Sequence, residues 1–333
     1  MSVTIDEVAR RAQVSRSTVS RALRNSALIS EATRERVWHV AQELGYVPNY
    51  VAQSLSLNRT NTIGMVITHS ANPFIWQVIE GVELAAYERG FSLILSTARN
   101  DREREYAVMQ SFQRRRVDGI IVSSSHMKTI YSRAQQSIEI PVILINEQVA
   151  HAAFHSVSID DYEGARLAVQ HLVNSGHQRI GYIACTDRPR SSEKRYRAYC
   201  DVLVESGLKP LPELRMRETT LQDFEIGFAA AESVMQSGVT AAFCYNDRIA
   251  VGLQAKLRKL GVPAPDALSV VGFDDIDEAQ YAIPALTTVR QPKLQMGRRA
   301  VEMLASILNQ EEVENEILDC ELVVRDSTKR LQH

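Results

Sequence analysis

The sequence predicts a small N-terminal all-α helix-turn-helix domain followed by a larger α/β domain with two doubly wound parallel sheets. In the first sixty residues, apolar side chains recur at helical spacing in three short segments. From Thr62 onwards, short apolar runs alternate with segments of helical periodicity, which is typical of parallel β/α units. A chain of 333 residues is long enough to fold as two or three domains.

The first two predicted helices lie close together in the sequence. Thr4 and Glu7 have the spacing of a capping box, and a helical apolar stripe follows them. Ser15 can cap the second helix, and the intervening residues 12–14 leave no room for a long loop. Two short helices joined in this way form a helix-turn-helix. The residues expected to face their shared core are Ile5, Val8, Ala9, Ala12, Val19, Ala22 and Leu23.

A third helix is predicted to begin after Ser30 and to stop at Gly45, with Pro48 soon after. Its apolar face comprises Val37, Val40, Ala41 and Leu44. Three helices with so few apolar residues make a small core, as DNA-reading modules often have.

The second predicted helix exposes arginine and hydroxyl side chains. Arg16 and Arg21 can each make a bidentate contact with O6 and N7 of guanine in the major groove. Ser17, Thr18 and Ser20 can bond phosphates or base edges. A polar helix face that merely contacts solvent has the same pattern, so the spacing alone leaves DNA binding open.

Charge is distributed unevenly along the chain. Residues 1–60 contain eight arginines, no lysine and five acidic residues, a net charge of +3. The whole chain has a formal net charge of −2, so the remainder carries −5. This asymmetry is expected where one module meets phosphates and the rest does not.

Seven apolar runs in the rest of the chain are predicted to form buried parallel strands. They lie at 62–67, 91–96, 118–123, 141–146, 179–184, 241–246 and 268–274. Segments 76–90 and 162–176, which lie between such runs, have helical periodicity and end in glycine. Ligands of open α/β sheets bind outside the carboxyl ends of the strands, so polar residues there are candidates for a binding site.

Polar or aromatic side chains stand at the carboxyl ends of several predicted strands. Each Asn or Asp there can be a turn residue or a helix cap, but their recurrence at the same end favours a binding site. Carboxylates and carboxamides bond hydroxyl groups, and an aromatic ring covers the apolar face of a sugar, so the set suits a polyol. The candidates are Asn72, Phe74, Ser123, Ser124, Ser125, Asn146, Asn246, Asp247, Asp274 and Asp275.

The segment TIDEVARRAQVSRSTVSRALRNSALISEATRERVWHVAQELGYVPN resembles the N-terminal module of the LacI/GalR family of bacterial repressors at nearly every position. The resemblance implies that Arg16, Ser17 and Arg21 read bases. The following NYVAQSLSLNRT resembles the family's hinge, whose short helix inserts into the minor groove and kinks the DNA. Leu55 also fits the core of an ordinary amphipathic helix, but the polar run 58–61 favours a linker. The DNA contacts expected in total are Thr4, Arg16, Ser17, Thr18, Ser20, Arg21, Asn49, Ala52 and Leu55.

The resemblance continues through NPFI, HLVNSGHQRIGYIA, KRYRAY, YNDRIAVG, VVGFDDID, PALTTVRQP and VVRDST. These motifs are also similar to periplasmic sugar-binding proteins of the ribose type, which implies a periplasmic-binding-protein-like sensor domain. The effector contacts that it implies are Asn72, Phe74, Ser123, Asn146, Arg195, Asn246, Asp274 and Gln291. Arg195 rather than Arg197 is matched to the family's binding arginine, because Tyr199 matches the aromatic residue four positions on. Ile75, where many members have an aromatic residue, and Ala198, where glycine is usual, depart from the pattern and leave the identity of the sugar open.

The resemblance also sets the expected domain limits. A helix-turn-helix DNA-binding domain is expected at 1–48, a hinge helix and linker at 49–61, and an effector-binding and dimerisation domain at 62–333. Within the last, one subdomain is expected at about 62–161 and 291–325, and the other at about 162–290.

Other classes of protein fit the sequence less well. No apolar stretch is long enough to predict a membrane span, and the N-terminus is charged where a signal peptide is apolar, so a cytoplasmic protein is expected. An exported sugar-binding protein would share the C-terminal fold but not the DNA-reading helices. Asp274-Asp275 supply no complete cation site, no catalytic constellation is evident, and the four cysteines are widely spaced. Neither a metal, a cofactor nor an enzymatic activity is therefore expected.

The sequence thus predicts a sequence-specific transcriptional regulator, most simply a repressor, under allosteric control by a small polar effector. A sugar or sugar derivative is the expected effector, and a nucleoside or purine is the alternative. Whether the effector releases or promotes DNA binding stays open. A homodimer on a pseudo-palindromic double-stranded operator is expected, because the operator mirrors the two-fold symmetry of the protein.

Overall fold

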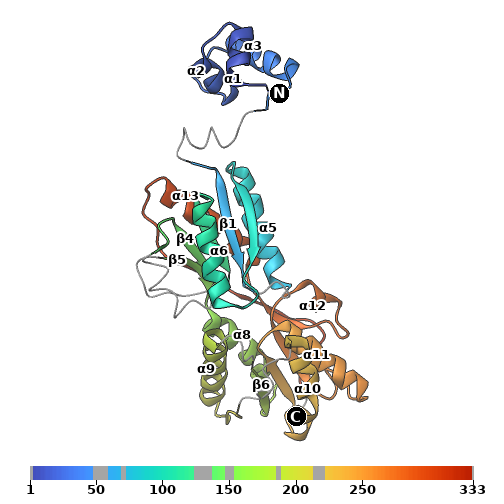
Figure 1. Cartoon of the computed structure of the whole chain (residues 1–333). Coiled ribbons are helices and arrows are strands. Elements are labelled where there is room, and N and C mark those ends of the chain that lie inside the picture. Colours follow the sequence, from blue (N-terminus) through green and yellow to red (C-terminus); the bar gives the residue numbers. More distant parts are fainter. Residues whose placement is uncertain are drawn as a thin grey trace. The chain divides into compact units, whose positions relative to one another are not determined.

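The computed structural model describes residues 3–47, 59–68, 73–123, 137–146, 154–184, 189–212 and 222–331. By its internal contacts the chain divides into two compact units, Met1–Asn61 and Thr62–His333 (Figure 1). No helix among the described residues is long and apolar enough to cross a membrane. Four of the predicted contacts, Asn49, Ala52, Leu55 and Asn72, lie outside the described residues.

Three helices form the first unit: α1 (Ile5–Ala12), α2 (Arg16–Leu23) and α3 (Glu31–Glu43). Each packs against the other two, and their buried faces share one core. The predicted inward residues are all in this core or packed against it, so the three-helix prediction is confirmed.

Of the three N-cap residues of this unit, Thr4, Ser15 and Ser30, only Ser15 caps its helix through its side chain. The amide of Thr18 donates to Ser15 Oγ at 3.1 Å, as expected of an N-cap. The capping box predicted from Thr4 and Glu7 is wrong: the Glu7 amide donates to the backbone carbonyl of Thr4 at 3.1 Å, and the Thr4 side chain caps nothing. Gly45 follows α3 with a φ of 64°, a left-handed conformation that glycine adopts without steric cost.

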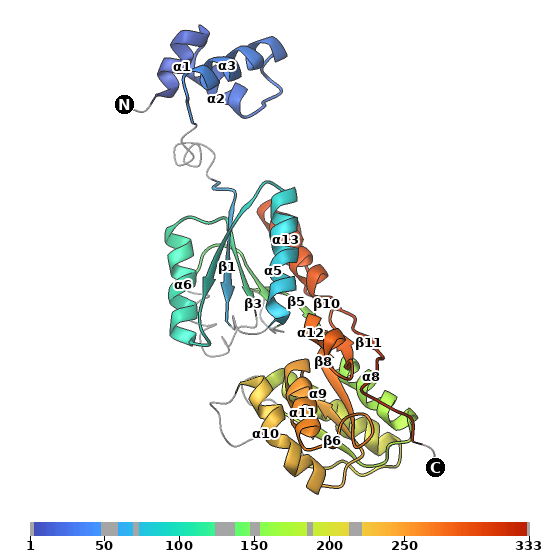
Figure 2. The same cartoon turned by 90° about the vertical axis from the view of Figure 1, so that its right-hand side faces the viewer.

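The first sheet of the second unit has six strands in the order β10-β5-β4-β3-β1-β2, and all their pairings are parallel. The strands are β1 (Thr62–Ile67), β2 (Ser92–Thr97), β3 (Gly119–Ser123), β4 (Val142–Ile145), β5 (His155–Ile159) and β10 (Glu316–Leu318). Helices α5 (Phe74–Glu88) and α13 (Lys293–Leu308) pack together on one face, and α6 (Arg102–Arg114) covers the other (Figure 2).

The second sheet has five strands in the order β11-β9-β8-β7-β6. Its strands are β6 (Ile180–Ile183), β7 (Ala241–Cys244), β8 (Ser269–Asp274), β9 (Thr287–Arg290) and β11 (Glu321–Val323). Only β11 is antiparallel to its neighbour. Its helices are α8 (Asp161–Asn174), α9 (Pro189–Glu205), α10 (Asp223–Gln236), α11 (Asp247–Lys259) and α12 (Asp277–Tyr281). Figure 1 shows the α8–α9 pair on one side of the strands and the α10–α11 pair on the other.

The chain passes between the two sheets three times: after β5, after β9, and between β10 and β11. In the last passage only Asp319 and Cys320 separate a strand of the first sheet from a strand of the second. The first subdomain was expected to run to residue 325. The structure differs there, because Glu321–Val323 pair with β9 in the second sheet.

All seven predicted strands form, but one of them is not buried. The run at 91–96 was predicted to be a buried strand, whereas β2 is the edge of its sheet and its side chains are largely accessible. Ile94 and Leu95 are 38% and 44% exposed. An apolar edge strand of this kind is a ready surface for another chain.

Two glycines let α10 and α11 cross backbone against backbone. A Cβ atom at Gly227 would lie 1.8 Å from the Ile249 carbonyl oxygen, and one at Gly252 would lie 2.0 Å from the Phe224 carbonyl oxygen. Neither position can hold a side chain unless the helices separate.

Candidate functional site

The second helix of the first unit presents a basic outer face. Arg16, Ser17 and Arg21 are exposed on α2. Within the described residues no ion pair engages Arg16 or Arg21, whereas Arg10 on α1 pairs with Glu7 at 3.5 Å. Two arginines without a carboxylate partner on one short helix suit contacts with DNA.

Hydroxyl groups gather at the N-terminus of the same helix. Ser15 Oγ lies 2.8 Å from both Ser17 Oγ and Thr18 Oγ1. Ser20 is half-buried one turn further along, and Thr4 is exposed just before α1. Hydroxyls and backbone amides at a helix N-terminus are suited to a phosphate group.

In the second unit, a chain of hydrogen bonds joins the carboxyl ends of the two sheets. Asn146, directly after β4, donates from Nδ2 to Gln291 Oε1 at 3.5 Å. Gln291, directly after β9, donates from Nε2 to Asp274 Oδ1 at 2.6 Å. Three residues that the sequence placed in the effector site therefore meet across the two sheets.

At the carboxyl ends of β3 and β4, Ser123 Oγ and Asn146 Oδ1 are buried without a hydrogen-bond partner among the described residues. Ser123 is only 1% exposed. Buried polar atoms are normally hydrogen-bonded, so an unpartnered pair at the ends of adjacent strands is a place where a ligand would supply the missing partners.

Arg195, on α9, is buried beside the carboxyl end of β7, which Tyr245 directly follows. Its Nε and Nη2 atoms lie 2.9 and 2.8 Å from Asp161 Oδ1, and its Nη1 donates to the Tyr245 carbonyl oxygen at 2.5 Å. The guanidinium carbon lies 3.6 Å from the centre of the Phe273 ring. Burial by itself lowers the pKa of Arg195, but the nearby Asp161, Tyr245 and Asp274, with Asp161 contributing most, more than offset it, so the arginine stays charged. Ser123, Asn146, Arg195, Asp274 and Gln291 are called the strand-end cluster below.

Two other predicted contacts have structural roles that the sequence left open. Asn246 caps α11, because its Oδ1 accepts from the Ile249 amide at 3.0 Å, and its Nδ2 donates to Asp223 Oδ2 at 2.7 Å. Phe74 is 6% exposed and belongs to the hydrophobic core on the α5 side of the first sheet.

Asp274 and Asp275 form a turn with unusual backbone geometry, at φ values of 120° and 52°. The buried Lys293 ammonium donates to both of their carbonyl oxygens. Asp275 Oδ2 accepts from Arg290 Nε at 2.7 Å, and its Oδ1 accepts from Arg325 Nη2 at 2.6 Å. Burial alone would raise the pKa of Asp275, but the hydrogen bonds from these two arginines hold it below its usual range.

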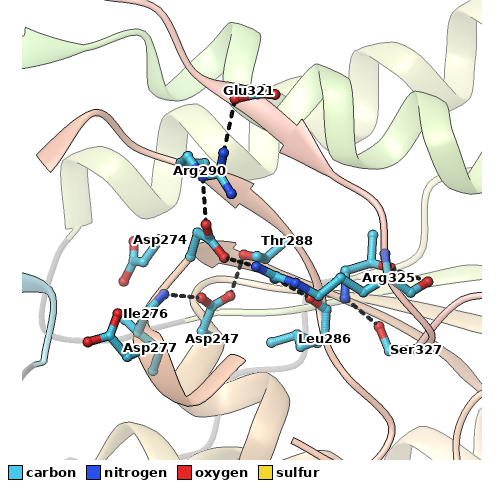
Figure 3. Close-up of polar contacts among 12 residues, drawn as sticks. Asp247, Asp274, Ile276, Asp277, Leu286, Thr288, Arg290, Glu321, Arg325 and Ser327 are labelled. Atoms are coloured by element: carbon cyan, nitrogen blue, oxygen red, sulfur yellow. Dashed lines mark hydrogen bonds and ion pairs between the residues drawn. The ribbon is translucent and has the colours of Figure 1, made fainter. Parts of the chain in front are cut away.

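Asp247, the first residue of α11, is fully buried beneath this turn (Figure 3). Its Oδ2 accepts from the Ile276 amide at 2.9 Å, and its Oδ1 accepts from the Thr288 hydroxyl. Burial, reinforced by the negative charge of Asp274, raises the pKa of Asp247 to about 7. Through these two hydrogen bonds the carboxyl group links the turn that follows β8 to the second residue of β9.

Four residues in contact with the strand-end cluster were missed from the sequence: Asp161, Tyr245, Phe273 and Lys293. Tyr245 and Phe273 directly precede the predicted Asn246 and Asp274, so their position was available as a signal. Asp161 follows β5, a strand that was not predicted. Among the described residues, no group of three His, Cys, Asp or Glu side chains could hold a metal ion.

A helix-turn-helix unit joined to two parallel sheets with a polar cluster between their carboxyl ends defines a class of protein: a DNA-binding regulator with a small-molecule sensor. Family models agree, because residues 4–49 match bacterial regulatory proteins of the lacI family and residues 169–328 match a periplasmic binding protein-like domain. The chain belongs to the lacI family of bacterial regulatory proteins and is a DNA-binding transcriptional repressor of that family.

Curated relatives and solved structures cover nearly the whole chain. The HTH-type transcriptional repressor PurR of Aliivibrio salmonicida is 32% identical over 98% of this chain and 99% of its own length. The repressor CytR of Escherichia coli K12 is 31% identical over 98% of this chain and 97% of its own. The lac repressor dimer bound to operator and the anti-inducer ONPF matches with a TM-score of 0.88 at 27% identity, over 99% of this chain and 100% of that one. These relatives are named as repressors rather than enzymes.

Proposed function

We propose that this repressor is controlled by a small polar effector that binds at the strand-end cluster. The observation that carries the proposal is the hydrogen-bonded path from Asn146 through Gln291 to Asp274, which spans the ends of both sheets. A ligand that bonds to both ends of this path favours one arrangement of the two sheets over another, which is the differential binding that allosteric control needs. Asn72, Phe74 and Asn246 remain predicted contacts of the same ligand.

The effector class that fits best is a sugar or sugar derivative. Carboxylate, carboxamide and hydroxyl side chains at the cluster suit a ligand with several hydroxyl groups. Solved structures similar to this chain include a regulator CelR–cellobiose complex and a LacI family regulator with bound ribose, at 30% and 26% identity. A nucleoside or purine is the second candidate, because it also combines hydroxyl or amino donors with a flat ring, and because PurR and CytR are among the relatives.

The proposed site is tested by a thermal-shift screen of sugars and nucleosides on the full chain, followed by calorimetry with the compound that raises Tm most. Asp274→Asn keeps the shape of the side chain and removes its charge, so we expect it to bind operator normally and to lose its response to that compound. Asp266→Asn, at a largely exposed aspartate paired with Lys329, is the matched control. Unaltered affinity in Asp274→Asn would place the effector elsewhere.

On the DNA side, Arg16 and Arg21 are proposed to read bases, with Ser17, Thr18, Ser20, Thr4 and Asn49 as supporting contacts. Residues 1–48 are proposed as the DNA-binding domain and 49–61 as a hinge. Leu55 and Ala52 are proposed to enter the minor groove of the operator. The protein is proposed to act in the cytoplasm. A Leu55→Ala chain should then bend operator DNA less in a circular-permutation gel assay, and equal bending would refute the wedge.

The protein is also proposed to act as a homodimer on a pseudo-palindromic operator. Exposed apolar side chains on neighbouring elements support this: Trp76, Leu84 and Tyr87 on α5, and Ile94 and Leu95 on the edge strand β2. Ile94→Glu is expected to shift sedimentation towards the monomer. Val204→Glu, at an exposed apolar residue on α9, is the control and should leave the dimer intact.

A further inference from the structure

The described cations in contact with the Asp274–Asp275 turn, and Arg195 of the strand-end cluster, are compensated within the protein. Arg290 and Arg325 share the carboxylate of Asp275. Lys293 donates to the carbonyl oxygens of Asp274 and Asp275 and has four aspartates close enough to act on its charge. Arg195 is paired with Asp161.

The Arg195–Asp161 pair differs from the others because Arg195 belongs to the cluster itself. Its side chain is 5% exposed and that of Asp161 is 16% exposed, so solvent screens the pair little. Asp161 engages Nε and Nη2, and the Tyr245 carbonyl engages Nη1. Nη1 and Nη2 each carry a second N–H group, which leaves donors for a ligand although the charge is neutralised.

The rest of the cluster is rich in acceptors. Asn146 Oδ1 is buried without a hydrogen-bond partner among the residues that the structure describes, Ser123 Oγ can accept as well as donate, and Asp274 carries a carboxylate. A ligand that fits these atoms brings hydrogen-bond donors such as hydroxyl or amino groups. Among the described residues, a phosphate or carboxylate at the cluster would meet the charge of Asp274, and the nearest buried arginine, Arg195, is already paired with Asp161.

We propose that Asp161 is a specificity-determining residue, which neutralises Arg195 so that the effector site accepts uncharged, donor-rich compounds and rejects anionic ones such as sugar phosphates. Asp161 acts through Arg195 and is a positioning residue for it. This inference rests on the proposed effector site and narrows the class of ligand that the site takes.

Inorganic phosphate is the probe, titrated against the full chain at constant ionic strength, because added salt would otherwise change screening between points. We expect the parent protein to show no saturable rise in Tm. Asp161→Asn removes the neutralising charge and should bind phosphate about tenfold more tightly than the parent or better. Asp160→Asn is the matched control, since Asp160 is the adjacent aspartate and caps α8 through the Tyr162 and Glu163 amides.

The added variant Asp161→Asn/Arg195→Met should lose the phosphate response again, which a merely structural effect of Asp161→Asn would not predict. Phosphate binding to the parent that disappears in Arg195→Met would overturn the proposal. An Asp161→Asn chain that folds and does not respond to phosphate would also overturn it, because compensation by Asp161 would then not be what excludes anions.

A second measurement uses the parent alone, in case Asp161→Asn does not fold once Arg195 is left unpaired. Ribose is compared with ribose 5-phosphate, glucose with glucose 6-phosphate, and cytidine with cytidine monophosphate. No phosphorylated member should stabilise more than its neutral partner. If a phosphorylated compound binds better than its neutral partner and loses affinity in Asp274→Asn, the selection of neutral ligands is refuted but the site stands. If a neutral compound binds the parent and Asp274→Asn equally well, the site itself is refuted.

Discussion

Lys293 reaches from the first turn of α13 to the end of β8 and donates from its ammonium to the Asp274 carbonyl oxygen at 2.6 Å. The lysine is 4% exposed, and α13 packs on the first sheet whereas β8 belongs to the second. A single buried ammonium group on a helix of the first sheet thus bonds the left-handed turn at the end of a strand of the second sheet.

Lys293→Met is expected to lower the free energy of unfolding of the second unit, called the sensor unit below, by roughly 1–3 kcal/mol, because two buried carbonyl oxygens lose their donor. Chemical denaturation measures this change. Lys256→Met, at a lysine that pairs with the exposed Glu232 on the surface, should cost less than about 1 kcal/mol. Equal losses in the two variants would contradict the role of Lys293.

Asp247 gives the sensor unit a distinct dependence on pH. Its pKa is about 7 in the folded protein against a model value of 3.8, so between these values the folded state holds a proton that the unfolded state has lost. The free energy of unfolding should therefore fall as pH rises from about 4 to about 7, by at most about 4 kcal/mol from this group. The contribution is complete below pH 4 and absent above pH 7.

Asp247→Asn should flatten that slope, because the amide does not titrate. The comparison is made on the difference between parent and variant at pH 5 and pH 8, in which contributions from other groups such as His171 and His177 cancel. A difference that is the same at both pH values would show that Asp247 is ionised throughout the range.

Arg16→Ala is expected to weaken binding to the selected operator by about 1–3 kcal/mol and to relax specificity at one base pair. The operator is first obtained by selection from random DNA with the full chain, and affinity is then measured at fixed salt. Arg10→Ala is the control, since Arg10 is exposed on α1 and paired with Glu7. An equal loss on random DNA would identify Arg16 as a phosphate contact.

Gly227→Ala should destabilise the second sheet and its helices by more than about 2 kcal/mol, because the new methyl group would lie 1.8 Å from the Ile249 carbonyl oxygen. Gly181→Ala is the matched control, as its Cβ would meet nothing closer than 3.6 Å. Thermal unfolding of the two variants compares them directly. Similar Tm values would mean that α10 and α11 separate at little cost.

The helix-turn-helix could be predicted from the sequence because its core is local: the inward residues of three short helices are the ones that pack together. The seven predicted strands were found because they are continuous apolar runs. Strand β5, His155–Ile159, has a histidine and two serines, and β10 and β11 have three residues each, so apolar runs could not reveal them.

Part of the candidate site could also be predicted, because its residues stand at the ends of strands that the apolar runs reveal. Asn146, Asp274 and Gln291 end strands, and the ends of parallel strands meet at one edge. The partner of Arg195 was not predictable, because Asp161 is 34 residues away and reaches it only through the packing of α8 on α9. Which cations are neutralised is a property of the tertiary structure.

The passage from β10 to β11 sets the order in which a nascent chain becomes a regulated protein. The helix-turn-helix core draws only on residues of its own unit, so it can fold as soon as residues 3–47 have left the ribosome. Each sensor sheet takes its last strand from residues 316–323, so neither sheet is complete until translation has passed that point. A chain that ends before residue 316 therefore has the residues of a complete helix-turn-helix core but lacks the edge strand of each sheet.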